Sequence, residues 1–135
     1  MIKEKLSGGT FRHIEGEIYD YHESKRELDQ LREDILFSPS GVKNAAYVKD
    51  PTGEKAVNMI VHRRISHLEK VTEAIYSVYE KLPERKKRLV HFLYWNRPQQ
   101  YTWEGIAQQL YISKRQAQRW RKSFVEDIAK RLGWR

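Results

Sequence analysis

The segment from Thr102 to Lys122 constrains the fold more strongly than any other part of the chain, and it reads TWEGIAQQLYISKRQAQRWRK. Its apolar residues recur with the period of two short helices. Thr102 and Ser113 are residue types that cap helix N-termini, and Gln116 completes a capping-box pattern with Ser113. The segment therefore predicts two helices joined by a tight turn. Tyr111 stands where such a turn usually has glycine, so we expect either an awkward backbone conformation or a looser turn.

The second of these helices has a basic outward face without an acidic residue. Ala117 and Trp120 are expected to turn inward, which leaves outward Lys114, Arg115, Gln118, Arg119, Arg121 and Lys122. Arg matches the two acceptors of guanine and Gln matches adenine, whereas Lys and additional Arg neutralise phosphates. The pattern favours a helix that reads the major groove of double-stranded DNA. The simpler interpretation is an amphipathic helix whose charged side is only solvated.

The positive charge of the chain is unevenly distributed. Of the formal net charge of +8, residues 1–53 contribute −2, residues 54–101 contribute +5 and residues 102–135 contribute +5. A surplus beside the predicted reading helix favours a polyanionic partner. No run approaches the roughly 18 apolar residues of a membrane span, and the first ten residues lack the apolar stretch of a secretory signal. Cysteine is absent. We therefore expect a cytoplasmic protein without disulfides and without a membrane partner.

Two long helices are predicted before this segment. The first is expected from Thr10, as its cap, to about Phe37, and the second from Pro51, with Asp50 as its cap. Residues 38–49 show no clear period and predict a flexible loop. Between Val61 and Leu82 apolar residues alternate four and three apart. This stripe fits a hairpin within one chain, a coiled-coil homodimer, or both.

The predicted fold class is all-α, with a long helical hairpin over residues 1–82 and a trihelical helix-turn-helix domain over residues 83–135. Pro83 is expected at the first position of a helix that runs to Trp95, and Gly133 ends the last helix. The sequence has no evident nucleophile–base pair, phosphate-binding glycine loop, paired-carboxylate motif or metal-ligand spacing. We therefore expect no enzymatic activity, no cofactor and no metal.

The C-terminal half resembles region 4 of bacterial sigma factors, in LPERKKRLVHFLYWNRP, TWEGIAQQL and YISKRQAQRW. Nearly the whole chain resembles the RinA-type phage transcriptional activators, relatives of the ArpU-type regulators. That resemblance is found in TFRHIEGEIYDYHESKREL, in DPTGEKAVNMIVHRRISHLEKVTEAIYSVYEKLPERKKRLV and in YWNRPQQYTWEGIAQQLYISKRQAQRWRKSFVEDIAKRLGW. It implies a phage or prophage activator of late or packaging genes, which binds promoter DNA in the bacterial cytoplasm and can contact host RNA polymerase.

The resemblance also implies roles for individual residues. Lys114, Arg115, Gln118 and Arg119 would face base edges, and Thr102, Arg121 and Lys122 would face phosphates. Ser113 and Gln116, at the start of the reading helix, complete the expected DNA-binding set. The sigma pattern usually has an acidic residue early in this helix, where the chain has Arg115. Promoter specificity is therefore not transferable from the sigma family.

Two other functions fit the sequence. A DNA-packaging adaptor similar to a small terminase subunit also combines a helix-turn-helix with oligomerising helices, and it would form a ring of about eight or more chains. A polymerase-docking protein would use the basic helix to bind an acidic protein surface instead of DNA. The order of segments, with the DNA reader last, favours the activator over the packaging adaptor.

Overall fold

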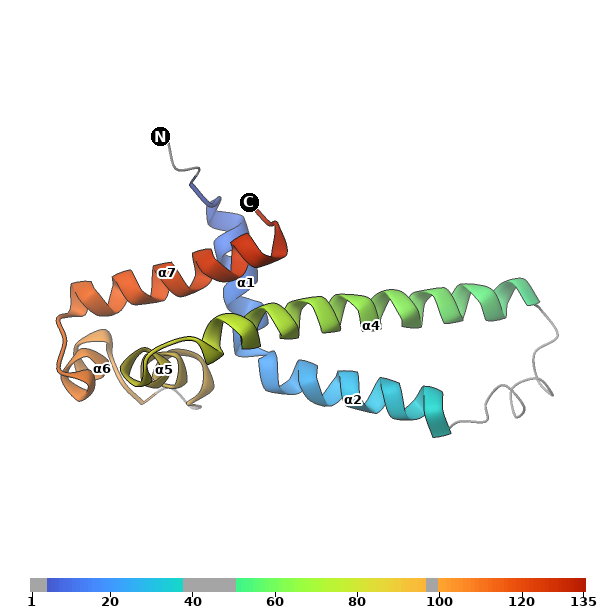
Figure 1. Cartoon of the computed structure of the whole chain (residues 1–135), viewed down its shortest axis with the longest axis horizontal. Coiled ribbons are helices and arrows are strands. Elements are labelled where there is room, and N and C mark those ends of the chain that lie inside the picture. Colours follow the sequence, from blue (N-terminus) through green and yellow to red (C-terminus); the bar gives the residue numbers. More distant parts are fainter. Residues whose placement is uncertain (1–4, 38–50, 97–99) are drawn as a thin grey trace. The chain divides into compact units, whose positions relative to one another are not determined.

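The structure is a computed structural model that describes residues 5–37, 51–96 and 100–135. All regular secondary structure within these ranges is helical, which confirms the predicted all-α class (Figure 1). The elements are α1 (Gly8–Tyr19), α2 (Tyr21–Phe37), α4 (Pro51–Glu80), α5 (Glu84–Val90), the π-helix η1 (His91–Trp95), α6 (Trp103–Leu110) and α7 (Lys114–Leu132). The loop predicted over residues 38–49 and the cap predicted at Asp50 lie outside the described residues.

The helices form two compact units. The larger unit comprises residues 1–20 and 73–135, and thus α1, the last turns of α4, and α5 to α7. The smaller unit comprises residues 21–72, with α2 and most of α4. The predicted domain boundary after Leu82 concerns independent folding and stays a prediction.

The prediction of one continuous first helix is wrong. α1 ends at Tyr19, and the backbone of Asp20 (φ −90°, ψ 4°) closes it by donating from its N–H to Gly16 and Ile18. α1 also begins earlier than expected, because the Ser7 hydroxyl caps it by accepting from the Thr10 N–H at 3.1 Å. The reason for the break is tertiary. α1 packs on α7 and η1, whereas α2 packs on α4.

The third predicted helix also differs at its ends. Pro83 (φ −60°, ψ 156°) is the cap and not the first helical residue, so α5 begins at Glu84. Its α-helical hydrogen bonding gives way after Val90 to the wider π-helical turn η1, which ends at the predicted Trp95. The Trp95 indole N–H donates to the Ile18 carbonyl at 2.8 Å and so ties η1 to α1.

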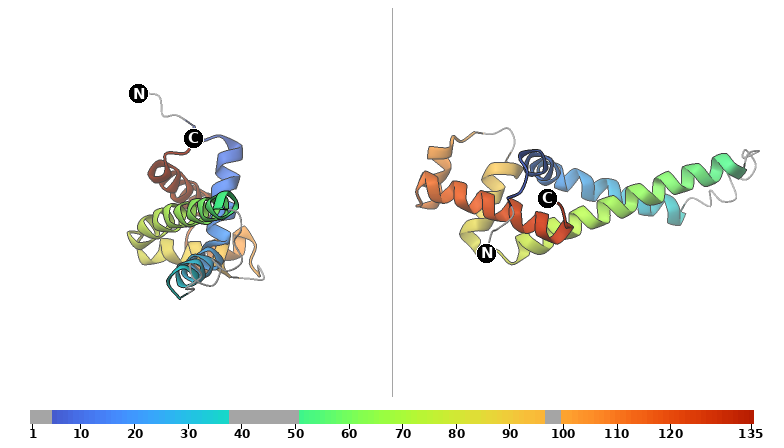
Figure 2. Two further views of the ribbon diagram at one scale, coloured as in Figure 1. Left: turned by 90° about the vertical axis from the view of Figure 1, so that its right-hand side faces the viewer. Right: turned by 90° about the horizontal axis from the view of Figure 1, so that it is seen from above.

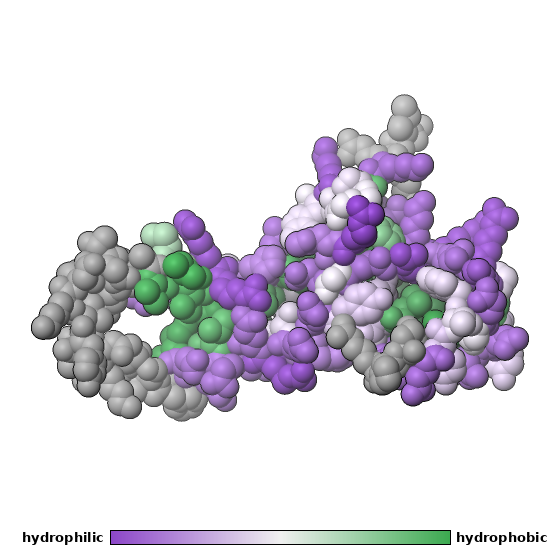
Figure 3. Space-filling view, turned by 180° about the vertical axis from the view of Figure 1, so that it is seen from behind, coloured by the Kyte–Doolittle hydropathy of each residue, from purple (hydrophilic) through white to green (hydrophobic). Residues whose placement is uncertain are grey.

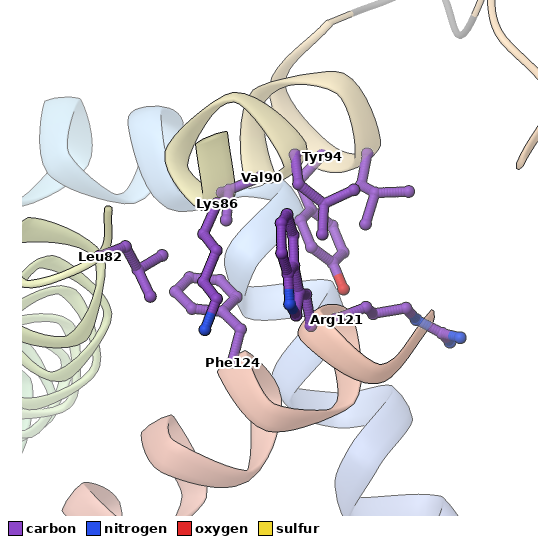
Figure 4. Close-up of a pocket in the computed structure, with 9 residues that line it drawn as sticks. Leu82, Lys86, Val90, Tyr94, Arg121 and Phe124 are labelled. Atoms are coloured by element: carbon purple, nitrogen blue, oxygen red, sulfur yellow. The ribbon is translucent and has the colours of Figure 1, made fainter. Parts of the chain in front are cut away.

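The larger unit is built around the inner faces of α6 and α7. Leu89, Ile106, Leu110 and Ala117 form one buried cluster, and the half-buried Ile112 and Trp120 pack against it. Farther along α7 the buried side chains are Phe124, Val125, Ile128, Ala129 and Leu132. Between α5 and α7 the packing leaves a cavity of only about 10 Å³, lined by Lys86, Val90 and Phe124 among others (Figure 4). That volume holds no more than about one water molecule.

The residues that follow α7 contact the first turns of α1. The predicted end of the last helix at Gly133 is confirmed, since Gly133 has a left-handed backbone (φ 74°) and Trp134 N–H donates back to the Ala129 carbonyl. The Trp134 ring meets the His13 ring edge-on at 5.2 Å between centroids. The Thr10 hydroxyl donates to the Arg135 carbonyl. The end of α7 therefore lies against the start of α1 (Figure 2).

In the smaller unit, α2 and α4 share an apolar seam. Leu28, Ile65 and Leu68 are buried there, with Leu31 and Val61 packed against them. The Arg64 guanidinium donates twice to the Glu27 carboxylate, at 2.7 and 2.9 Å, and this lowers the pKa of Glu27. Part of the predicted apolar stripe of α4 is thus used within one chain. Whether it also forms a dimer stays a prediction.

Some apolar residues of the smaller unit are exposed. They are Ile35, Val57, Met59 and Ile60, with exposed fractions between 48% and 65%. Figure 3 shows apolar surface on this unit. No helix in the described ranges is both long and apolar enough to cross a membrane.

The placement of α1 in the larger unit is testable by substitution. Ile14 is fully buried, so Ile14→Ala should lower the free energy of unfolding by about 2–5 kcal/mol through lost burial and a residual cavity. All four tryptophans lie in the larger unit, and a denaturant titration followed by tryptophan fluorescence therefore reports on that unit. Ile60→Ala, at a side chain that is 65% exposed, is the control and should change stability by less than about 0.5 kcal/mol. An unchanged fluorescence transition for Ile14→Ala would contradict the packing of α1.

Candidate nucleic-acid interface

Helices α6 and α7 are joined by three residues whose geometry is locally determined. The Thr102 hydroxyl caps α6 by accepting from Gly105 N–H at 3.1 Å, and the Ser113 hydroxyl caps α7 by accepting from Gln116 N–H at 3.0 Å. Both predicted caps are therefore confirmed. The capping box is half formed, because no bond from the Gln116 side chain to Ser113 occurs among the described residues.

Tyr111 closes α6 in a left-handed conformation, with φ 57° and ψ 43°. It is the one non-glycine residue with positive φ in the described part of the chain. Its N–H donates to the Gln108 carbonyl, and the N–H of Ile112 donates to the Ala107 carbonyl. The turn is therefore tight, and of the two alternatives for Tyr111 the awkward backbone is the one adopted. Such a conformation costs roughly 1–2 kcal/mol for a residue with a Cβ.

The first half of α7 exposes a continuous basic face. Lys114, Arg115, Gln118, Arg119 and Lys122 are all exposed, whereas Ala117 between them is fully buried. These five belong to the predicted DNA-binding set, and the structure places them on one side of one helix. Ser113 is exposed and Gln116 is half-buried at its start. Thr102, also in the set, is exposed but engaged as the cap of α6.

Only one of the five outward side chains has a partner among the described residues. Lys114 Nζ lies 2.9 Å from Glu104 Oε1, and this lysine is the main cause of the lowered pKa of Glu104. Arg115, Gln118, Arg119 and Lys122 form no hydrogen bond or ion pair within the described ranges. Their donors are therefore directed to solvent, where an external ligand can reach them.

Arg121 was predicted to face phosphates, but it is engaged inside the larger unit. Its Nε and Nη2 donate to both oxygens of the Glu15 carboxylate, at 2.9 and 3.0 Å. The guanidinium lies 5.0 Å from the centre of the Phe11 ring and 5.6 Å from that of Trp103. Hydrogen bonding to Glu15 raises the pKa of Arg121. Arg121 thus joins α7 to α1 instead of standing with the basic face.

Tyr94 completes the arrangement around Glu15. Its hydroxyl donates to Glu15 Oε2 at 2.7 Å, and burial, followed by this bond, raises its pKa well above the usual range. Figure 4 shows the Tyr94 hydroxyl pointing toward the Arg121 side chain. The sequence contained one indication that Arg121 points inward. Arg121 lies four residues after Ala117 and three before Phe124, which is the spacing of the buried face.

The structure adds one basic residue that the sequence had not singled out. Arg85 of α5 donates from Nη2 to the carbonyls of Leu110 and Tyr111, at 2.6 and 3.0 Å. Its neighbour Lys86 has its ammonium 5.4 Å from the centre of the Trp120 ring. The available signal was the net charge of +5 over residues 54–101, which does not by itself distinguish Arg85 from the other basic residues of this segment.

The positive charge belongs almost entirely to the larger unit. Residues 1–20 and 73–135 contain 17 basic and 10 acidic side chains, a net charge of +7 out of +8. No group of three His, Cys, Asp or Glu side chains placed to hold a metal ion is found among the residues described. The side chains on the exposed face of α7 can donate hydrogen bonds, and their positive charges can bind anions.

The internal role of Arg121 predicts a loss of stability on substitution. Arg121→Gln leaves Glu15, whose side chain is 16% exposed, without its cationic partner, and should cost about 1–3 kcal/mol in the free energy of unfolding. Lys122→Gln, at the adjacent exposed position, is the matched control and should change stability by less than about 0.5 kcal/mol. Thermal unfolding followed by circular dichroism measures both. Equal, small effects would mean that the Glu15–Arg121 pair contributes nothing.

Comparison with known proteins identifies the family of the chain. No curated protein and no solved structure matches it. One family model matches residues 7–130, which is most of the sequence. The match spans α1 to nearly the end of α7 and thus includes both compact units. The chain therefore belongs to the family described as "Protein of unknown function (DUF722)".

Proposed function

We propose that the protein is a sequence-specific regulator of transcription that binds double-stranded DNA. In this proposal α5, α6 and α7 act as a helix-turn-helix unit, and α7 is the reading helix. The observation that supports it best is the exposed face of α7 formed by Lys114, Arg115, Gln118, Arg119 and Lys122. This face contains no acid and follows a capped three-residue turn. Four of its five side chains have no partner among the described residues.

The spacing of the outward side chains suits a DNA groove. Arg115, Gln118, Arg119 and Lys122 occupy positions i, i+3, i+4 and i+7 and so form one stripe along the helix. The stripe is about 10 Å long at 1.5 Å per residue, which corresponds to roughly three base pairs. Arg115, Gln118 and Arg119 are assigned to base edges, where their side chains can bond in two places. Lys122 is assigned to phosphates. Lys114 is assigned to them as well, in place of the base-edge contact that the resemblance implies, because an ammonium lacks the two-point geometry of arginine and glutamine.

Charge supports a polyanionic partner. The larger unit has a net charge of +7, and contacts to about six phosphates would lower affinity by roughly three decades between 50 and 200 mM salt. One reading helix covers too few base pairs for useful specificity. A second copy of the chain or a co-bound protein is therefore required. A homodimer formed by α2 and α4, part of whose apolar surface is exposed, is our candidate for the second copy.

The biological role follows from the resemblance to RinA-type activators. We propose a phage or prophage activator of late or packaging genes that acts in the bacterial cytoplasm. Activation would consist of binding promoter DNA and recruiting host RNA polymerase, as region 4 of sigma factors does. No enzymatic step, cofactor or metal is part of this mechanism.

The deciding experiment is a bind-and-sequence selection of the full chain from a random duplex pool at about 150 mM salt. This salt concentration weakens non-specific binding because the release of counterions from DNA becomes less favourable. An enriched motif is the expected result, and a palindrome would identify a symmetric dimer. Salt-sensitive binding without enrichment, together with a ring of about eight or more chains in solution, would favour a packaging adaptor over the proposed regulator. Absence of DNA binding, with retention of RNA polymerase, would favour the docking protein.

Substitution of Arg119 separates base reading from phosphate binding. Arg119→Ala should cost about 1–3 kcal/mol at one base position of the enriched motif and leave the helix content unchanged. Lys122→Gln is the comparison, and it should weaken binding to all sequences and reduce the salt slope by about one. Repeating the selection with each variant measures the two effects. If Arg119→Ala bound less only because it had unfolded, Arg119 would have no reading role.

Glu104 provides a substitution that should strengthen binding. It is the acidic partner of Lys114 at the reading face, so it competes with phosphate for that ammonium. Glu104→Gln should raise affinity for random duplex about two- to fivefold, in line with the modest strength of exposed ion pairs. Asp127→Asn removes the same charge about 20 Å farther along α7, beyond the screening length, and should have little effect. Equal effects of both variants in a fluorescence anisotropy titration would exclude a specific contribution of Lys114.

A further inference from the structure

The connection between α6 and α7 is bridged by a residue from a third helix. Arg85 of α5 donates to the carbonyl of Leu110, the last residue of α6, and to that of Tyr111. These carbonyls belong to a helix C-terminus, where backbone acceptors lack intrahelical partners and the helix dipole is negative. A guanidinium at this position donates hydrogen bonds to these carbonyls and also places a positive charge at the negative end of the dipole.

The turn that Arg85 bridges contains a strained residue. Tyr111 is held at φ 57° although it has a Cβ, and its side chain is 88% exposed and so adds little packing. Glycine would adopt this conformation without strain. The chain therefore keeps an unfavourable turn at the base of the reading helix, and the described contacts that act on its outer carbonyls come from Arg85.

Arg85 also contacts α7 directly. Its guanidinium carbon lies 5.8 Å from the centre of the Trp120 ring, which is within the range of a cation–π contact. Trp120 packs against the buried cluster that contains Leu110 and Ala117. Arg85 therefore touches the end of α6, the turn and the second turn of α7, which are the three parts whose relative geometry orients the basic face.

We propose that Arg85 is a positioning residue that fixes the direction of α7 relative to α6. In this role it touches no DNA and affects sequence recognition through the α6–α7 turn. The DNA part of the proposal rests on the function proposed above, whereas the clamp itself is a property of the free protein. The two parts are therefore tested separately.

The clamp is tested by hydrogen exchange of the full chain without DNA. In Arg85→Gln, the amide of Ile112, which donates to Ala107 across the turn, should exchange at least about tenfold faster, because local opening becomes easier. Arg88→Gln removes the same charge from the same helix, and Arg88 contacts only the Phe92 ring among the contacts described. It should leave this amide unchanged. Equal exchange rates in the two variants would overturn the proposal, whatever the function of the protein.

The effect on recognition is tested with two probes, the duplex enriched by the wild-type chain and a random duplex of equal length. Arg85→Gln should weaken binding to the enriched duplex about tenfold or more, and should weaken random duplex no more than Arg88→Gln does. A parallel loss on both probes, with a salt slope smaller by about one, would identify Arg85 as a phosphate contact instead. If the wild-type chain enriches no duplex, the proposed function fails, and the exchange result alone decides the clamp.

A second substitution tests the mechanism by rescue. Tyr111→Gly removes the strain of the left-handed residue, so the double variant Arg85→Gln/Tyr111→Gly should regain slow exchange at Ile112 and preference for the enriched duplex. A lost phosphate contact would not be restored by a glycine in the turn. If the double variant recovered neither the slow exchange of the Ile112 amide nor the preference for the enriched duplex, the positioning role would be contradicted.

Discussion

The ion pair between Glu15 and Arg121 determines how the last helix is presented. Both guanidinium donors and the Tyr94 hydroxyl converge on one carboxylate, so three elements, α1, η1 and α7, meet at a partly buried and fully paired charge. A charge in such a place is tolerated only when its partners are satisfied, which strongly restricts the rotation of α7 about its own axis. With Arg121 turned toward α1, the side chains of Arg115, Gln118 and Arg119 face solvent.

The consequence is that the basic face depends on residues far away in the sequence. α1 comes from the first twenty residues, yet it packs on α7 and on η1. The end of α7 is in turn tied to α1 through Thr10 and His13. Arg85 joins the opposite end of α7 to α5 through the turn. The helix proposed to read DNA is thus supported at its start by α5, and at its middle and its end by α1.

This arrangement fits the DNA recognition that we propose. Rigid placement of long donors matters for reading base edges, because a bidentate hydrogen bond tolerates little error in position. The net charge of +7 lies in the larger unit, where we propose that a polyanion binds. The smaller unit, with α2 packed on α4, has a net charge of only +1 and is our candidate for dimerisation. Membership in the DUF722 family, whose model spans both units, indicates that they occur together in related chains.

The sequence by itself determined the features that depend on near neighbours. The caps at Thr102 and Ser113 and the end at Gly133 each involve residues within five positions, so local patterns predicted them. At Tyr111 the sequence left two alternatives, and the structure adopts the left-handed one. Only the tertiary structure decided the break at Asp20, the inward role of Arg121 and the clamp by Arg85. The partners in these cases are 25 to 106 residues apart, and no local pattern specifies which distant surface a helix will meet. Arg121 looked like its exposed neighbours because charge alone does not distinguish a solvated arginine from a paired one.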